Sequence, residues 1–384
     1  MMYDFDTVVN RRGTTSVKWD ILEENELPMW VADMDFKAAP EILKALQDRM
    51  DNGVFGYSII PDEWAQSYVN WWRTRHDFEM DPSWLCYSTG VIPVLSSAVR
   101  KFTTPNDNVV IQTPVYNVFF NSVVNNGRRV LESPLLYKDG EYSMDLVDLE
   151  TMLCDPQTTM MILCNPHNPV GKIWDKETLA KIGELCWKYN VLVVSDEIHC
   201  DITDPDVSYV PFASVSDHCR YNSITAMAPT KAFNIAGIQS AAAMAANPNL
   251  RHKIRRALNT DEVAEPNAFS IAATIAAFNH GAQWLDELRS YVYENKQVAC
   301  KFVKENIPAI HIVPSKATYL LWLDCSAFCT DSVELVNEIR RKTGLFLSNG
   351  TQYGEAGKTF LRMNLACPKT LLLDGLDRLK RALV

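Results

Sequence analysis

The middle of the chain alternates short, uninterrupted apolar runs with helical periodicity. The runs at 160–165 and 191–195 have the length of strands, and residues 176–189 between them carry apolar side chains at helical spacing. Two further strand candidates follow at 223–226 and 240–245. Apolar strands that alternate with helices are typical of a mostly parallel sheet covered on both faces. The sequence therefore predicts an α/β fold with such a sheet at its centre.

The pattern changes towards the C-terminus, where residues 317–323 and 359–365 indicate strands on either side of a helix at 333–343. We expect that helix to end at Gly344, since glycine commonly follows the last turn of a helix. These pieces predict a smaller α+β unit. The N-terminal residues hold too little apolar core to fold alone, so we expect them to pack on this unit. The expected division is a small domain from residues 1–48 and 286–384 and a large domain from residues 49–285.

Composition and charge argue against a nucleic-acid-binding protein, a membrane protein, a secreted protein and a zinc-binding protein. The chain has 37 basic and 47 acidic residues, a formal net charge of −10, whereas a nucleic-acid-binding face needs clustered positive charge. No apolar run approaches the roughly 20 residues of a membrane span, and the acidic start lacks the basic and apolar regions of a signal peptide. The ten cysteines form no zinc-binding pattern. We therefore expect a cytoplasmic protein with reduced thiols, no metal site, no nucleic-acid partner and no membrane association.

Three polar residues follow three of the apolar runs. Asp196 comes directly after the second run, Asn168 lies in a proline-rich turn past the first, and Lys231 lies just past the third. Each residue alone has a plain structural explanation, as a capping carboxylate, a turn amide or a solvated lysine. The carboxyl ends of parallel strands meet at one edge of a sheet, which is where α/β proteins bind ligands. The order of these residues therefore favours one shared ligand site.

These residue types match the chemistry that holds pyridoxal 5′-phosphate (PLP). A lysine can form an imine with the cofactor aldehyde, a carboxylate can keep the pyridine nitrogen protonated, and an amide can donate to the phenolic oxygen O3′. Burial at a strand end would lower the pKa of Lys231 from about 10.4 towards about 7–8, which imine formation needs. The chain lacks the Gly-x-Gly-x-x-Gly pattern of dinucleotide sites.

The phosphate of such a cofactor needs backbone N–H groups and hydroxyls. The run Ser88-Thr89-Gly90 precedes an apolar helix that we expect from about Val94. A glycine at a strand-to-helix turn lets backbone N–H groups point at an anion. Thr230, beside the lysine, could add a hydroxyl. This signal is weak by itself, because many helices begin after such a turn.

Three further side chains are candidates for the same site. Tyr116, which follows a Thr-Pro pair, could stack on the cofactor ring, although a core aromatic is the ordinary alternative. Arg362 is flanked by apolar residues in a strand, where a substrate carboxylate gripped bidentately, or a protein carboxylate, would offset its buried charge. His199 lies three residues after Asp196 and could face the same ligand, or be a satisfied loop histidine.

The order Asn168, Asp196, Lys231 and then Arg362 resembles that in PLP enzymes of fold type I, the aspartate aminotransferase superfamily. More specifically, the chain resembles the MalY/PatB cystathionine β-lyase (C–S lyase) group. The resemblance implies an aspartate-aminotransferase-like α/β fold, with a large domain on a mostly parallel sheet and a smaller α+β domain from both chain ends. It spans nearly the whole chain, and its motifs are highly specific as a set. The segments that carry it are 3–6, 10–13, 17–20, 28–36, 55–57, 165–171, 195–199, 228–237 and 360–368.

The resemblance implies roles for the residues already singled out. Lys231 would bind the cofactor covalently and act in catalysis, and Asp196 would pair with the pyridinium. Asn168 would donate to O3′ and help to bind the substrate carboxylate. Arg362 would bind that carboxylate together with the backbone near Ala32. These roles are expectations carried over from the family, position by position.

The remaining implied roles concern the ring face, the phosphate and the assembly. Tyr116 would stack on the ring and take part in catalysis, and Val91 and Ile92 would lend backbone amides to the phosphate. Tyr57 would reach the phosphate in the neighbouring subunit. The resemblance therefore implies a homodimer with its active site at the subunit interface. His199 and Thr230 would be further contacts of the cofactor.

The implied activity is β-elimination of L-cystathionine or related cysteine S-conjugates, which gives a thiol such as homocysteine, pyruvate and ammonia. One alternative is an aminotransferase on the same scaffold, because it uses the same residue types. Another is a regulatory or interaction protein that retains the PLP fold. Three positions depart from the wider aminotransferase pattern and make the phosphate contacts the least specified part of the site. They are Ala228, His199 and Gln239.

Overall fold

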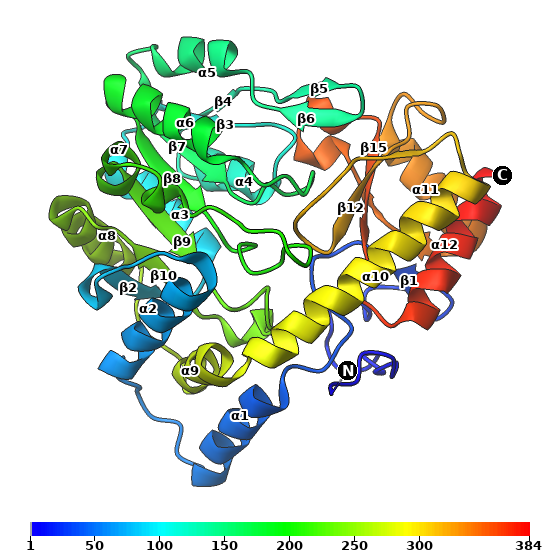
Figure 1. The fold of residues 1–384 in the computed structure, drawn as a ribbon, viewed down its shortest axis with the longest axis horizontal. Helices are drawn as coiled ribbons and strands as arrows, with labels where there is room; N and C mark the ends of the chain where they lie inside the picture. Colours follow the sequence, from blue (N-terminus) through cyan, green and yellow to red (C-terminus); the bar gives the residue numbers. More distant parts are fainter. Residues whose placement is uncertain (1) are drawn as a thin grey trace.

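The computed structural model describes residues 2–384, and its largest element is a seven-stranded sheet (Figure 1). Strand β10 runs antiparallel to both of its neighbours, and the other adjacent strands run parallel. The prediction of a mostly parallel central sheet is confirmed. In spatial order the strands are β2 (Leu85–Ser88), β10 (Ala241–Met244), β9 (Ser223–Met227), β8 (Leu192–Asp196), β7 (Thr158–Cys164), β3 (Asn108–Ile111) and β4 (Arg129–Glu132).

Helices cover both faces of this sheet, which explains why its inner strands are buried along nearly their whole length and are largely apolar, whereas the edge strand β4 is partly exposed. In β7, Met160 and Ile162 pack in a cluster with helix α3 (Val91–Phe102). Met161, between them in the sequence, packs in a second cluster with α6 (Lys176–Lys188). Neighbouring strand residues point to opposite faces, so each face needs its own apolar residues. The other helices of this part are α1 (Pro40–Asn52), α2 (Asp62–His76), α4 (Val118–Val124), α5 (Leu146–Leu153), α7 (Asp217–Tyr221), α8 (Pro248–Thr260) and α9 (Ser270–His280).

A second sheet, antiparallel throughout, lies in the C-terminal part of the chain. Its strands, in spatial order, are β11 (His311–Ile312), β12 (Leu320–Asp324), β15 (Phe360–Asn364) and β14 (Ser348–Asn349). The helices that share an apolar cluster with it are α10 (Ala282–Asn306), α11 (Ser332–Thr343) and α12 (Lys369–Leu383). A short hairpin elsewhere joins β5 (Leu136–Lys138) to β6 (Glu141–Ser143). The 3-10 helices are η1 (Pro82–Trp84), η2 (Phe212–Ser214), η3 (Ala236–Ile238), η4 (Thr351–Tyr353) and η5 (Glu355–Gly357).

The N-terminal chain contributes to this C-terminal unit. Strand β1 (Leu27–Pro28) pairs in parallel with β13 (Leu345–Phe346). In Figure 1 the long helix α10 runs diagonally from α9 towards the C-terminal helices α11 and α12. We propose that the two sheets form the centres of two domains, although the boundaries expected at residues 48/49 and 285/286 fall inside helices α1 and α10.

The predicted elements are found with small shifts at their ends. Helix α11 ends at Gly344, whose φ of 71° is the left-handed conformation that glycine adopts without steric cost. Helix α3 begins at Val91, about one turn before the predicted start, because Pro93 is tolerated in the first turn of a helix. Strand β12 begins only at Leu320, because Thr318 has a positive φ of 69° that interrupts extended backbone.

Two global properties bear on the environment of the protein. Among residues 2–384, no helix is both long and apolar enough to cross a lipid bilayer. All ten cysteines have free thiols, and most of them are buried. A buried free cysteine behaves as a small apolar side chain, so these thiols contribute to the core.

Gly350 lies at a close approach of two backbone segments near β15. A Cβ atom at this position would overlap the carbonyl oxygen of Gly357 and lie 2.5 Å from that of Phe360. Neither backbone can give way cheaply, so we expect Gly350→Ala to lower the free energy of unfolding by about 2–3 kcal/mol, as in other overpacked sites. Urea unfolding measures this. Gly237→Ala is the control, because nothing lies within 4 Å of its Cβ position. An equal loss in both variants would contradict the prediction.

Candidate active site

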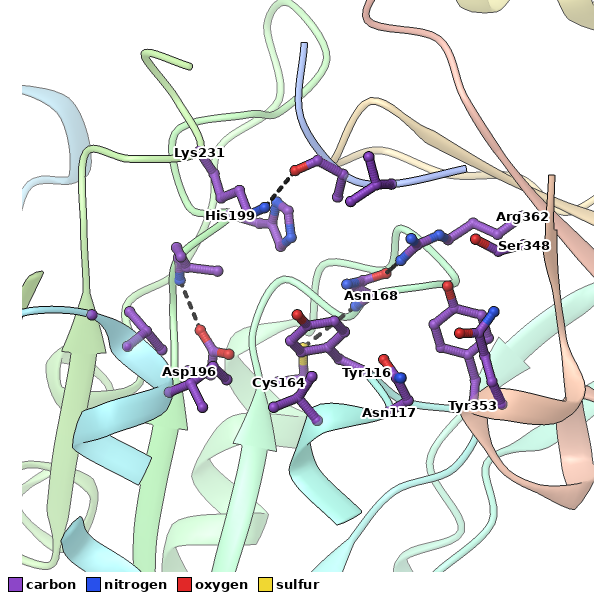
Figure 2. Close-up of a pocket in the computed structure, with 18 of the residues that line it drawn as sticks. Tyr116, Asn117, Cys164, Asn168, Asp196, His199, Lys231, Ser348, Tyr353 and Arg362 are labelled. Carbon is purple, nitrogen blue, oxygen red and sulfur yellow. Dashed lines mark hydrogen bonds between the residues drawn. The ribbon is translucent and has the colours of Figure 1, made fainter. Parts of the chain in front are cut away.

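A cavity of about 360 Å³ lies where β7, β8 and β9 end (Figure 2). The three predicted strand-end residues, Asn168, Asp196 and Lys231, all line it. The other walls come from the start of helix α3, from a segment around Ala32 and from strand β15, which carries Arg362. The structure therefore brings together residues that are far apart in the sequence, at the sheet edge that the sequence indicated.

Asp196 is the last residue of β8, and its side chain is buried in the cavity wall. Burial raises the pKa of its carboxyl to about 7, although the N–H of Ile198 donates to Oδ1 at 3.1 Å and nearby Lys231 favours the ionised form. A buried carboxylate is costly unless a cation pairs with it. A protonated ring nitrogen would supply that cation and keep Asp196 ionised.

Lys231 lies in the loop after β9, and its side chain is directed into the cavity. Burial and, to a smaller extent, the charge of Arg362 lower the pKa of its amine to about 8, against the opposite effects of Asp33 and Asp196. Its Nζ atom contacts the carbonyl oxygen of Ala32. A lysine with this pKa carries a substantial fraction of uncharged, nucleophilic amine near neutral pH.

Arg362 lies on the opposite side of the cavity from Lys231 in Figure 2. Its Nη1 donates to Asn168 Oδ1 at 3.2 Å, and its Nη2 donates to the carbonyl of Trp30 at 2.9 Å. The guanidinium lies over the ring of Tyr353, with Cζ 4.9 Å from the ring centre. Its Nε is buried and has no hydrogen-bond partner in residues 2–384. This buried arginine therefore keeps a donor free for a carboxylate.

The start of helix α3 forms an anion-binding wall. Gly90, Val91 and Ile92 line the cavity, and no side chain caps this helix end. The first N–H groups of a helix have no partner within the helix and attract anions. The structure thus places Val91 and Ile92 where a phosphate could bind. Thr230 is buried but is not among the lining residues, and Tyr57 is fully exposed on the loop between α1 and α2.

Tyr116 and His199 complete the predicted set. The backbone N–H of Tyr116 donates to the carbonyl of Asn168 at 3.1 Å, which ties the two residues together. Burial raises the pKa of the Tyr116 hydroxyl, so that group stays protonated at neutral pH. Burial, together with the charges of Lys231 and Arg362, lowers the pKa of His199 to about 3, so its imidazole is neutral. Its Nδ1 is buried without a partner in the described part of the chain.

Sequence reasoning missed several lining residues. One of them is Tyr353, whose place in the sequence, at the end of η4 and directly before Gly354, gives no signal of a ligand site. Cys164 was interpreted only as a buried thiol, although it ends β7 and its Sγ lies 3.4 Å from the Asn168 N–H. The others carry no periodic or motif signal. They are Asn117, Val118, Ser348 and Gln352.

The donor set fits PLP. The cavity offers a buried carboxyl for the ring nitrogen, an amine with a lowered pKa, an amide at Asn168 and an uncapped helix end for a phosphate. Two buried polar atoms, Nδ1 of His199 and Nε of Arg362, are left without partners in the described chain, as expected when a polar ligand belongs there. The cavity volume is that of an ordinary small-molecule site.

Comparisons with known proteins give a consistent answer. Residues 24–379 match the family described as aminotransferase class I and II. The chain is 43% identical to the cystathionine beta-lyase PatB of Bacillus subtilis, across 99% of this chain and 100% of that protein. It is 32% identical to the protein MalY of Escherichia coli, across 100% and 99% of the two chains.

A solved structure extends this likeness to three dimensions. Cystalysin from Treponema denticola, whose crystal structure contains a pyridoxal 5′-phosphate cofactor, superposes with a TM-score of 0.97. The two chains are 32% identical, and the match covers 100% of this chain and 99% of that one. At this level of coverage every element that lines the cavity has a counterpart in the aligned chain.

Proposed function

Since the chain belongs to the aminotransferase class I and II family, we propose that it is a PLP-dependent carbon–sulfur β-lyase. Its expected substrates are L-cystathionine and related cysteine S-conjugates, which it would split into a thiol, pyruvate and ammonia. The observation that carries the proposal is the meeting of the Lys231 amine and the Asp196 carboxyl in one cavity opposite a buried arginine. The lyase names of its near full-length relatives favour elimination over the aminotransferase alternative.

The cofactor would be held by four groups of the chain. Lys231 would bind it covalently, Asp196 would pair with its ring nitrogen, and Asn168 would donate to its phenolic oxygen. The first amides of α3, at Val91 and Ile92, would bind the phosphate. When bound, PLP supplies an aldehyde that condenses with amines and a cationic ring that takes up the electron pair released at the substrate Cα.

The side chains of the cavity then have distinct tasks. Arg362 binds the substrate carboxylate through its free Nε–H and so orients Cα. The Lys231 amine removes the Cα proton, because its lowered pKa keeps part of it uncharged. Asp196 supplies a fixed negative charge beside the ring nitrogen, where positive charge must be retained. The protonated Tyr116 hydroxyl or the Lys231 ammonium gives a proton to the departing sulfur.

The test is product formation by the purified protein. Loaded with PLP, it should release pyruvate, measured by coupling to lactate dehydrogenase, and a thiol, measured with a chromogenic disulfide, in equal amounts from L-cystathionine. Conversion of the cofactor to its amine form by the amino acid, reversed by an added keto acid and without pyruvate release, would favour the aminotransferase. Bound cofactor with no turnover of any thioether or amino acid would favour the regulatory alternative.

We also propose that the protein is a cytoplasmic homodimer. The loop between α1 and α2 exposes a cluster of apolar side chains, and such patches are typical of protein interfaces. Figure 1 shows α1 and this loop at the edge of the molecule, away from the large sheet. In this proposal Tyr57 of each subunit reaches the phosphate region of the other subunit's site. The free thiols agree with a reducing compartment. The exposed residues of the loop are Val54, Phe55, Tyr57, Ile59 and Ile60.

Mixing two inactive variants tests the shared site. Lys231→Ala and Tyr57→Ala homodimers should both be weak, because each lacks one component in both sites. After mild dissociation and mixing, each mixed dimer carries one site with both residues intact, so about one quarter of all sites should recover if subunits exchange freely in a two-fold dimer. The assay is pyruvate release against the unmixed variants. No recovery despite confirmed subunit exchange would show that Tyr57 serves its own chain.

The lowered pKa of Lys231 predicts how cofactor-free protein takes up PLP. Only the uncharged amine attacks an aldehyde, so the association rate should rise with pH, reach half of its maximum near pH 8, where the Lys231 pKa lies, and level off above that pH. Stopped-flow absorption measures this rate, and borohydride reduction followed by peptide mass spectrometry identifies the modified lysine. A midpoint near about 10.4, the value of a solvated lysine, would contradict the prediction.

A further inference from the structure

Residues 30–36, called segment 30–36 below, have no helix or strand structure, and the first three of them line the cavity. Buried carbonyl groups outside regular structure need other hydrogen-bond donors. In segment 30–36, six of the seven carbonyls accept a hydrogen bond from a side chain. The conformation of this segment is therefore set by side chains from distant parts of the sequence.

Both cavity cations touch this segment. Arg362 donates to the carbonyl of Trp30 at 2.9 Å, and Nζ of Lys231 contacts the carbonyl of Ala32. Figure 2 shows these two side chains on opposite sides of the cavity, with the segment passing above them. Segment 30–36 is thus a physical link between the residue that would bind the cofactor and the residue that would bind the substrate carboxylate.

Each of these cations has an asparagine on its own element that holds the same segment. Asn364 lies two residues beyond Arg362 in β15, so both side chains point to one face of the sheet. Its amide donates to the carbonyls of Val31 and Asp33 at 2.7 and 2.6 Å. The side chain of Asn364 is buried, and its Oδ1 accepts the Ala366 N–H at 2.8 Å, which fixes the amide orientation.

Asn234 also forms hydrogen bonds with segment 30–36. It lies three residues beyond Lys231, in the loop that follows β9. Its Oδ1 accepts the Met34 N–H at 3.0 Å, and its Nδ2 donates to the carbonyls of Met34 and Phe36 at 3.0 and 2.8 Å. Its φ of 55° lies in the left-handed region, which asparagine tolerates better than most residues. Asn234 therefore holds the end of segment 30–36 at residues 34 and 36, whereas Asn364 holds the part at residues 31 and 33.

We propose that Asn234 and Asn364 are positioning residues that act together through segment 30–36 to set the separation of Lys231 and Arg362. The inference rests on the proposed function, because it assigns those two cations to cofactor and substrate. If either asparagine is replaced, the segment is free to shift. The hydrogen bonds of the remaining asparagine then no longer fix the distance between Lys231 and Arg362. The effects of the two losses on substrate binding are therefore expected to be coupled.

A double-mutant cycle on the PLP-loaded enzyme tests this coupling. The variants are Asn234→Gly, which keeps the positive φ without cost, Asn364→Ala, and the pair of them. The probe is L-alanine, which has no leaving group, and its dissociation constant is read from the change in the cofactor's visible spectrum. Each single variant should weaken L-alanine about tenfold, as expected for lost buried hydrogen bonds. The double variant should be no more than about threefold weaker than the worse single variant, whereas independent sites would make it about tenfold weaker than that variant.

Hydrogen exchange gives a readout that does not depend on binding. In Asn364→Ala, the Met34 amide should exchange faster, although its own partner Asn234 is unchanged. A purely local role of Asn364 would leave Met34 protected. Asn249→Ala is the matched control, since this exposed asparagine at the start of α8 makes no side-chain contact with the cavity. It should change neither the affinity for L-alanine nor the exchange of segment 30–36.

Two results would overturn the inference, namely affinity losses that multiply in the double variant, or a Met34 amide that stays protected in Asn364→Ala. If a variant does not fold, Asn234→Asp and Asn364→Ser retain part of the bonding and give the same cycle. Failure of the proposed function would look different. In that case the parent protein would fail to develop the visible absorption with PLP, or Arg362→Ala would bind L-alanine as well as the parent does.

Discussion

Lys231→Ala is expected to lower the rate of pyruvate release from L-cystathionine by about 10⁴-fold, the upper range for loss of a positioned proton-transfer group. The variant also loses the covalent attachment, so the visible absorption of the lysine-bound cofactor should disappear or shift to that of free PLP. The physical reason is that no other amine lies in the cavity, where Lys231 is the only lysine among the lining residues of the described chain. Coupled kinetics and an absorption spectrum after dialysis measure the two effects.

The control for this experiment is Lys101→Ala. Lys101 lies on the same helix α3 whose first turn faces the cavity, but it is exposed at the far end of that helix. Its replacement should change neither the spectrum nor the rate. Small primary amines added to Lys231→Ala should restore part of the rate, because they can supply the missing base. If the Lys231→Ala variant kept both the visible absorption and the turnover, Lys231 would be neither the residue that binds the cofactor nor the catalytic base.

Asp196→Asn should lower kcat by about 10²–10³-fold, the range for removal of one fixed electrostatic partner. The substitution keeps the shape of the side chain and removes the charge that would hold the ring nitrogen protonated. Burial already raises the pKa of this carboxyl to about 7, so the ionised form depends on a cation beside it. The cofactor should remain attached to Lys231. The measurement is kcat together with the visible spectrum, which should retain a lysine-bound band.

Glu197→Gln is the matched control for Asp196. Glu197 is the next residue, and burial raises its pKa to about 7 as well. Its carboxyl does not line the cavity and instead accepts hydrogen bonds from Ser195 at 2.8 Å and from the Phe212 N–H at 3.0 Å. We expect this variant to lose stability to urea while keeping most of its kcat. If the two variants lost activity equally, general disruption of the loop would explain the result for Asp196.

The large sheet and its ligand edge were predictable because the signal is local. The inner strands β7, β8 and β9 are largely apolar because both of their faces are buried, and in each case the polar site residue lies at or just after the end of the strand. Asp196 is the last residue of β8 itself, and Lys231 follows β9 by four residues. Strand topology then brings such residues together, whatever the details of the intervening helices.

The residues that line the other half of the cavity could not be predicted from the local sequence pattern. Trp30, Ser348 and Tyr353 face the same space because the two chain ends pack together, and nothing in their neighbouring residues encodes that contact. Thr230 stands next to Lys231 in the sequence and is expected in the phosphate cradle, but it is not among the residues that line the cavity. Its proposed contact stays a prediction.

The pairing of β1 with β13 has a consequence for how the molecule is made. A ribosome releases the lysine loop and all seven strands of the large sheet well before it reaches residues 345–364. Until those residues emerge, Leu27 and Pro28 have no strand to pair with, and the wall that they lead into cannot be held in place. The strands of the larger sheet are therefore all synthesised before the residues that complete the pocket, among them Arg362 in β15.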